Sequence, residues 1–420
     1  MSPVRFAVIL LIPPPCGIRF LLRRDIAGIP LFKRLVLTLQ RAGLSEIAVL
    51  SREVPENEIP FAQGDLQNDP RFQGKLHWFD VDEILHTEGW KRFEALAASR
   101  NFLWIRGDTV TSPRLIREFI RKAETAGALA QKEITVLESP GNPPPKMYLF
   151  PAEKLEKLKE SLQSQDGIEA AAPVLVTPNN DFAVTVRDAP SVRLAEVGLI
   201  RNSGRHYKQV LDRVFNALFS KRISSLLVKT PLTPNQVTLM GLPIGLCSGW
   251  FFSWGNYWGG LLGALLLVGT AIWDCCDGDV ARLKLMESDF GDSLDTTCDN
   301  VINVFAFIGM MLGVAHTRGW AQALAPFLLL ALGGVSILIL IYFPRGAGKG
   351  GFFKGTRLYD TVQILASRNF IHIILLFAIF GRVDLFLWLA GFGSCLFALV
   401  LFLGKRKILL AAKAKQPLKK

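Results

Sequence analysis

Most acidic residues of the second half of the chain lie in one short stretch. Residues 201–420 contain 11 aspartate and glutamate residues, and eight of these lie between positions 274 and 299. They are Asp274, Asp277, Asp279, Glu287, Asp289, Asp292, Asp295 and Asp299. A lone charge at the centre of a membrane helix costs about 2.5–3.5 kcal/mol, and neighbouring like charges also repel one another. Divalent cations are the natural compensation, so the stretch predicts a metal site.

The spacing of four of these aspartates indicates how they would meet. Asp274 and Asp277 are three residues apart, and Asp295 and Asp299 are four apart, so each pair would share one face of a helix. Two neighbouring helices would then direct four carboxylates into one pocket. Ligands that offer only oxygen favour Mg²⁺, Mn²⁺ or Ca²⁺ over zinc. Such a centre suits a substrate that carries phosphate.

Small and basic residues accompany the carboxylates. Gly278 and Ala281 leave room beside them for a bulky ligand, and Gly291 lets the second helix begin close to the first. Arg282 can pair with a carboxylate or a phosphate. The other three aspartates of the stretch are expected to be solvated surface residues: Asp279, Asp289 and Asp292.

The elements that would position these residues are apolar helices. Six apolar stretches, each near the roughly 20 residues that a bilayer requires, lie at 236–254, 257–276, 296–316, 321–343, 362–381 and 384–403. Residues 205–230 alternate basic and apolar side chains, which predicts an amphipathic helix on the membrane surface. A helix that covers the N-terminal domain is the alternative.

Charge supports a membrane protein and gives its orientation. The mean hydropathy of the 420-residue chain is +0.30, and the whole net charge of +12 falls in residues 201–420. This is typical of a membrane domain with cationic cytoplasmic loops, and without a nucleic-acid motif we expect no nucleic-acid partner. The basic loops 282–292 and 344–360 and the basic tail predict a multi-pass protein of the inner membrane with both termini in the cytoplasm.

The first half of the chain has the pattern of an α/β domain. Apolar strands are predicted at 6–12, 47–50 and 102–105, with a helix over 30–43. Strand–helix–strand order favours a mostly parallel sheet. We therefore expect four parts, an α/β domain, a juxtamembrane helix, a six-helix membrane domain and a basic tail, at 1–200, 201–235, 236–405 and 406–420.

Eight positions of the acidic stretch match, in type and spacing, the complete signature of the CDP-alcohol phosphotransferases, which this region resembles. They are Asp274, Asp277, Gly278, Ala281, Arg282, Gly291, Asp295 and Asp299. The segment 233–238 also looks like the family's entry into its first membrane helix, and the resemblance covers about 205–405. An ion pathway would explain the aspartates but would not need Gly278, Ala281 and Arg282 in this register. A metal-dependent prenyl-transfer site is also acidic but normally uses DDxxD-type runs.

The resemblance implies six transmembrane helices, a homodimer, and transfer of a phospho-alcohol group from a CDP-alcohol to a second alcohol with release of CMP. Asp274, Asp277 and Asp295 would be metal ligands, and Asp299 a ligand and the general base. The metals would be two divalent ions, Mg²⁺ or Mn²⁺. The residues that would line the CDP site are Asn235, Gly278, Ala281, Arg282 and Gly291. Lys349, Lys354 and Arg357 are weaker candidates for contact with a phosphate on the acceptor.

Residues 1–200 resemble a sugar-phosphate nucleotidyltransferase domain, through the opening strand, Gly28 and Pro30, and Asp108 after a strand. The two-part chain thus resembles bifunctional inositol-phosphate cytidylyltransferase/di-inositol-phosphate-phosphate synthases. Prolines 13–15 stand where that family needs backbone N–H groups for the triphosphate. Leu21 stands at the expected lysine, and Thr185 near the second metal-binding aspartate. These departures predict a catalytically silent domain.

Three questions stay open at this point. A rewired but active cytidylyltransferase is the alternative for the N-terminal domain, and a membrane-anchored scaffold with both domains inactive is the alternative for the chain. Asn369 stands where many members of the family carry aspartate.

Overall fold

The computed structural model of the chain describes residues 4–14, 17–97, 100–125, 132–138, 146–164, 182–203, 217–342 and 370–414. Its contacts divide the chain into two compact units. The first comprises Met1–Gly204 with two short segments from further along the chain, Ser225–Pro231 and Ala281–Met286. The second comprises Arg205–Ser224, Leu232–Val280 and Glu287–Lys420.

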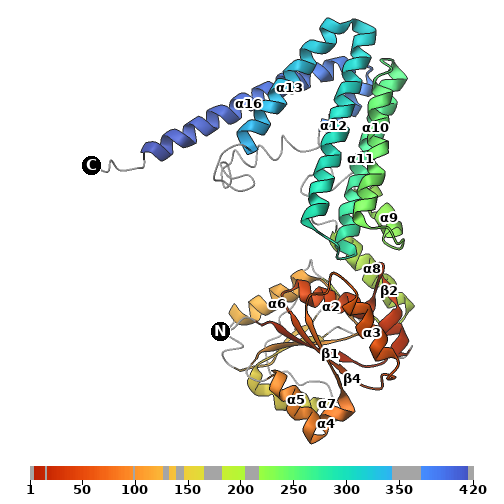
Figure 1. Ribbon diagram of the computed structural model, residues 1–420, viewed down its shortest axis with the longest axis vertical. Helices are drawn as coiled ribbons and strands as arrows, with labels where there is room; N and C mark the ends of the chain where they lie inside the picture. The colour runs from red at the N-terminus through yellow and green to blue at the C-terminus, as the bar shows by residue number, and fades with distance from the viewer. Residues whose placement is uncertain are drawn as a thin grey trace. The chain divides into compact units, whose positions relative to one another are not determined.

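The first unit contains a six-stranded sheet in the order β5-β4-β1-β6-β9-β8 (Figure 1). Strands β5, β4, β1 and β6 run parallel to one another, while β9 is antiparallel to both β6 and β8. The strands are β1 (Phe6–Leu11), β4 (Glu46–Ser51), β5 (Lys75–Asp80), β6 (Phe102–Arg106), β8 (Thr135–Glu138) and β9 (Lys146–Phe150). The predicted α/β domain with a mostly parallel sheet is confirmed.

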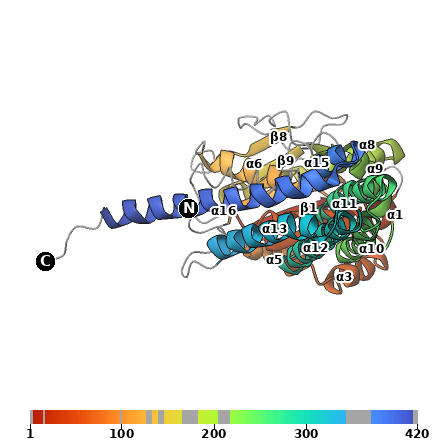
Figure 2. The same ribbon diagram turned by 90° about the horizontal axis from the view of Figure 1, so that it is seen from above.

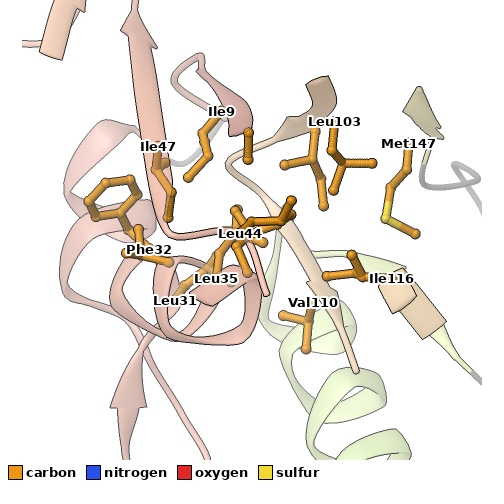
Figure 3. Packing of buried hydrophobic residues seen from close by; sticks show 14 of the residues in the cluster. Ile9, Leu31, Phe32, Leu35, Leu44, Ile47, Leu103, Val110, Ile116 and Met147 are labelled. Atoms are coloured by element: carbon orange, nitrogen blue, oxygen red, sulfur yellow. The ribbon is translucent and has the colours of Figure 1, made fainter. Parts of the chain in front are cut away.

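Helices cover both faces of this sheet because successive side chains of each strand point to opposite faces. On β1, Ile9 packs against the helices of one face and Val8 against those of the other. The first face is covered by α1 (Ile18–Arg23), α2 (Leu31–Arg41), α3 (Glu58–Gln67) and α6 (Pro113–Thr125), and the second by α4 (Val81–Leu85), α5 (Thr87–Ala97) and α7 (Leu155–Ser164). Figure 3 shows Ile9, Ile47 and Leu103 of the sheet beside Phe32 and Leu35 of α2.

Short elements complete the unit. They are the hairpin β2 (Asp25–Ile26) and β3 (Ile29–Pro30), the antiparallel pair β7 (Thr109–Thr111) and β10 (Ala183–Thr185), the 3₁₀ turn η1 (Ala152–Lys154) and α8 (Ala189–Ser203). The pairing of β7 with β10 matters for the chemistry because it brings the residues after Asp108 beside a distant part of the chain.

The second unit is helical. Its helices, two of which end with residues of the first unit, are α9 (Ala217–Leu227), α10 (Pro234–Phe252), α11 (Tyr257–Leu283), α12 (Asp289–Arg318), α13 (Trp320–Tyr342), α15 (Phe370–Ile379) and α16 (Val383–Ala414). Among the described residues, four helices are long and apolar enough to cross a membrane: α11, α12, α13 and α16. The predicted helical domain is therefore confirmed, and four of the six predicted spans meet both criteria among the described residues.

Local signals explain where two of these helices begin. Thr233 and Gln236 form a reciprocal capping box at the start of α10, with Pro234 in the first turn. The Ser288 side chain caps α12 by accepting a hydrogen bond from the Gly291 amide at 3.0 Å. Because of this cap, α12 begins seven residues before the apolar stretch that predicted it.

Glycines let α10 and α12 pack closely, and the two helices lie side by side (Figures 1 and 2). A Cβ on Gly309 would lie 2.1 Å from the Gly249 carbonyl oxygen, and one on Gly313 would lie 2.2 Å from that of Phe252. Small residues permit such backbone contact between membrane helices. This packing sets the place of α12 and of the aspartates on it.

We expect Gly309→Ala to destabilise the helical unit by about 1–3 kcal/mol, because the added methyl group cannot fit against backbone. Thermal unfolding of the purified chain in detergent would measure the loss. Gly334→Ala on α13 is the matched control, since a Cβ there meets no atom within 4 Å. An equal effect of the two substitutions would contradict the close packing of α10 and α12.

Candidate metal centre

Three of the predicted carboxylates come together at the junction of two helices. Asp274 and Asp277 of α11 and Asp295 of α12 each place one oxygen within 4.8 Å of the others. The Asp277 side chain is buried, and the other two residues are half-buried. We refer to Asp274, Asp277 and Asp295 as the aspartate trio.

The trio fits a divalent cation. The Oδ1 atom of Asp295 is buried and has no hydrogen-bond partner. Leaving such an atom without a partner is costly, and a bound cation would satisfy it. A site that offers carboxylate oxygen and no nitrogen or sulfur suits Mg²⁺, Mn²⁺ or Ca²⁺.

A third helix positions one member of the trio. The Thr238 hydroxyl of α10 donates a hydrogen bond to Oδ2 of Asp277 at 2.6 Å. Beside it, the Trp273 indole N–H donates to the Val237 carbonyl at 2.7 Å and ties α10 to α11. Thr238 was not among the predicted site residues. Its place at the end of the 233–238 motif was the available signal.

The fourth predicted ligand, Asp299, lies outside the trio. It is on α12, one helical turn after Asp295, and it is half-buried. The structure thus brings three of the four predicted ligands together. The assignment of Asp299 as ligand and general base stays a prediction.

The other predicted site residues lie on the same helices. A Cβ on Gly291 would lie 3.3 Å from the Asn235 side-chain oxygen, so the starts of α10 and α12 are close together there. Gly278 follows Asp277 directly on α11. Ala281 and Arg282 occupy the last turn of α11 and belong to the first unit by their contacts. Their role as CDP ligands also stays a prediction.

The prediction that Asp279 is a solvated surface residue is wrong. Its side chain is fully buried, and one carboxylate oxygen accepts a hydrogen bond from the Ser224 hydroxyl of α9 at 3.3 Å. Sequence patterns did not show that α9 covers this face of α11. Asp289 and Asp292 are exposed, as expected.

The N-terminal unit holds its candidate metal ligand in ion pairs. Asp108 is buried, and its carboxylate lies 3.0 Å from Arg106 and 3.5 Å from Arg187. Thr185 pairs in register with Thr109, directly after Asp108. The Leu21 side chain is fully buried in the hydrophobic core. Among the described residues, this region therefore offers a neutralised carboxylate in place of a pair of metal-binding aspartates.

Four weaker candidates lie outside the described residues: Lys349, Lys354, Arg357 and Asn369. So does the first part of the basic segment predicted at 205–230, since α9 is described from Ala217.

Comparison with known proteins places the trio in a family. Residues 231–381 match the family model of CDP-alcohol phosphatidyltransferases, so this part of the chain is a domain of that family. The chain is 37% identical over 93 residues to an archaetidylinositol phosphate synthase of Pyrococcus horikoshii, a match that covers 22% of this chain and 48% of that protein.

It is also 35% identical over 106 residues to a bifunctional IPC transferase and DIPP synthase of Rubrobacter xylanophilus, covering 25% of this chain and 23% of that protein. The chain thus spans less than two thirds of the length of either relative. Among solved structures, one described as a glucose-1-phosphate thymidylyltransferase of Bacillus anthracis aligns with 46% of this chain and 94% of its own. The TM-score is 0.36 and the sequence identity 12%.

Proposed function

We propose that this chain, which carries a CDP-alcohol phosphatidyltransferase domain over residues 231–381, is an integral membrane CDP-alcohol phosphotransferase. It would move a phospho-alcohol group from a CDP-alcohol to a second alcohol and release CMP, in the synthesis of phospholipids or related polyol phosphates. The observation that carries the proposal is the aspartate trio, with its buried, unpartnered Asp295 oxygen at positions of the family signature. The basic loops and tail support cytoplasmic termini. The chain would act as a homodimer, as the family resemblance implies.

Each residue would have a distinct task. The trio, with Asp299, would hold two divalent ions, Mg²⁺ or Mn²⁺, which when bound offset the negative charge of the diphosphate and of the departing CMP. Thr238 keeps the Asp277 carboxylate in one orientation through its 2.6 Å hydrogen bond. Arg282, in the last turn of α11, would pair with a donor phosphate.

The transfer itself needs a base for the acceptor. Asp299 would take the proton of the acceptor hydroxyl while that oxygen bonds to the donor's second phosphorus. The bond between this phosphorus and the bridging oxygen then breaks, and the oxygen leaves with CMP. A positioned general base contributes about 10²–10⁴-fold to a rate.

The test measures CMP release by the purified chain in detergent or lipid, with Mg²⁺ or Mn²⁺ and with CDP-diacylglycerol or CDP-inositol as donors. Asp299→Asn should lower the rate by about 10²–10⁴-fold. Asp292→Asn is the control, since Asp292 is exposed on the same helix and outside the signature. No CMP release from the unaltered chain with any donor would favour the scaffold alternative instead. Unchanged release by Asp299→Asn would refute this residue's role.

We further propose that the N-terminal unit is catalytically silent. The support is the pairing of Asp108 with Arg106 and Arg187 and the burial of Leu21. A carboxylate that is already neutralised by two guanidinium groups is a poor ligand for a metal–triphosphate complex.

We expect the full chain to release no pyrophosphate from CTP in the presence of inositol phosphate or sugar phosphates. The Asp299→Asn variant is the matched control, because its substitution is expected to abolish CMP release and to leave the N-terminal domain unchanged. Pyrophosphate release at equal rates from both proteins would show an active cytidylyltransferase and a bifunctional chain.

A further inference from the structure

The last turn of α11 and the loop after it, residues 281–286, contact the α/β domain within the first unit. Arg34 of α2 is 3% exposed, and its guanidinium donates to the Leu283 carbonyl oxygen at 2.7 Å. It also donates to the Ile26 and Ala27 carbonyls, at 2.9 and 3.0 Å. Leu283 is the last residue of α11, where carbonyl groups lack partners within the helix. Arg34 therefore supplies both a donor and a positive charge to this helix end.

Arg71 makes a second contact with the same backbone. It donates a hydrogen bond to the Lys284 carbonyl oxygen. Its guanidinium is fixed by Asp69 at 2.6 Å, and Asp69 also pairs with Lys33 at 2.7 Å. Burial alone would raise the pKa of Asp69, but the hydrogen bonds from Arg71 and Lys33 hold it well below its usual range. The network thus keeps Arg71 in place at neutral pH.

Burial of the loop side chains reinforces these polar contacts. Leu283 packs with Ala27 and Val228, and Leu285 packs against Ile29 and Leu37. The Lys284 ammonium, itself on a buried side chain, donates to the Thr230 carbonyl at 2.6 Å. Segment 225–231 is thereby tied to segment 281–286, and both belong to the first unit.

Segment 225–231 passes close to Gly28 of the α/β domain. A Cβ on Gly28 would lie 2.3 Å from the Val228 carbonyl oxygen, and its φ of +73° favours glycine. Gly28 belongs to the sequence pattern that resembles a nucleotidyltransferase. In this chain it lies against the backbone of Val228, which lies between α9 and α10 in sequence.

We propose that Arg34 and Arg71 fix the end of α11 and so set the place of Ala281 and Arg282, which belong to the first unit and would contribute to the donor site. Arg34 is then a positioning residue for phosphoryl transfer. The inference rests on the proposed function and deepens it, since it gives the silent domain a task. Without these anchors the end of α11 would fray, because the Leu283 and Lys284 carbonyl groups would lose these donors.

Gly28→Ala tests the inference without removing any charged group. The methyl group should push segment 225–231 away and free residues 281–286. The amides to follow are those of Leu285 and Met286, which donate to the Arg282 and Ala281 carbonyls at 3.3 and 2.8 Å. Hydrogen–deuterium exchange of the full chain should show faster exchange there. The donor KM should rise by about tenfold, the value of one charge-assisted hydrogen bond, with kcat changed much less.

Gly43→Ala is the matched control, since Gly43 has a φ of +104° and a Cβ there meets no atom within 4 Å. This substitution also places alanine at a positive φ, and it should leave exchange of 281–286 and the donor KM unchanged. Arg34→Met is the second variant and should raise the donor KM like Gly28→Ala.

The inference is overturned if exchange of 281–286 stays unchanged in Gly28→Ala and Arg34→Met. It is also overturned if these variants lower kcat alone, and to the same extent as Gly43→Ala, which indicates general destabilisation. If the unaltered chain releases no CMP, the proposed function fails by itself. The exchange measurement then still decides whether the N-terminal unit holds this helix end.

Discussion

Asp277→Asn should lower CMP release by about 100-fold or more. Asparagine keeps the shape of the side chain and still accepts the hydrogen bond from Thr238, so α10 and α11 stay joined. What disappears is one negative charge of the aspartate trio. Removing residues that only support a metal ligand already costs about 10–100-fold in affinity or activity, so losing a ligand should cost at least the upper figure.

The measurement is the initial rate of CMP release at saturating Mg²⁺, with Asp289→Asn as the control. Asp289 is an exposed aspartate at the start of α12, outside the signature, and its substitution removes the same charge. A rate for Asp277→Asn within a few-fold of the control would contradict the role of the trio. Thr238→Val should cause a smaller loss, because the carboxylate stays and only its orientation is freed.

Removing divalent cations should reduce CMP release by about a thousandfold, and Mg²⁺ or Mn²⁺ should restore it. The physical reason is that Asp274, Asp277 and Asp295 each place one carboxylate oxygen within 4.8 Å of the others, and that Oδ1 of Asp295 is buried without a hydrogen-bond partner. With the cation gone, nothing offsets the charge of the bound diphosphate, and such compensation is worth several kcal/mol.

A chelator followed by titration with each ion measures this dependence. Asp295→Asn should shift the Mg²⁺ concentration for half-maximal rate upward, because the side chain has lost a charged ligand atom. Asp292→Asn should leave the titration unchanged, since this exposed residue lies outside the trio. Full activity in excess chelator would refute the metal centre.

The sequence predicted the two kinds of fold through different physical signals. Apolar strands such as Phe6–Leu11 have to be buried on both sides, so helices on both faces of a parallel sheet follow from their composition. Helices such as α16 are apolar over enough length to cross a bilayer. The Asp274 and Asp277 pair was also predictable, because a spacing of three residues on a helix brings two carboxylates to one face.

Spacing along the chain was insufficient where a distant segment decides the environment. Asp279 was expected on the surface, but α9 buries it beside Ser224. Thr238 became a site residue only when α10 packed against α11 and placed its hydroxyl 2.6 Å from Asp277. Both contacts join residues about 40–55 positions apart, and no local periodicity encodes such a pair.

By itself, the sequence determined the kinds of elements, the carboxylate composition of the acidic stretch and the departures in the N-terminal domain. Those properties depend on residue type and on spacing within one helix or strand. Only the tertiary structure decided which carboxylates meet, that arginines neutralise Asp108, and that Arg34 reaches the Leu283 carbonyl 249 positions away. Each of these contacts depends on how helices and strands pack together. Residues become partners because their surfaces fit closely, whatever their separation along the chain.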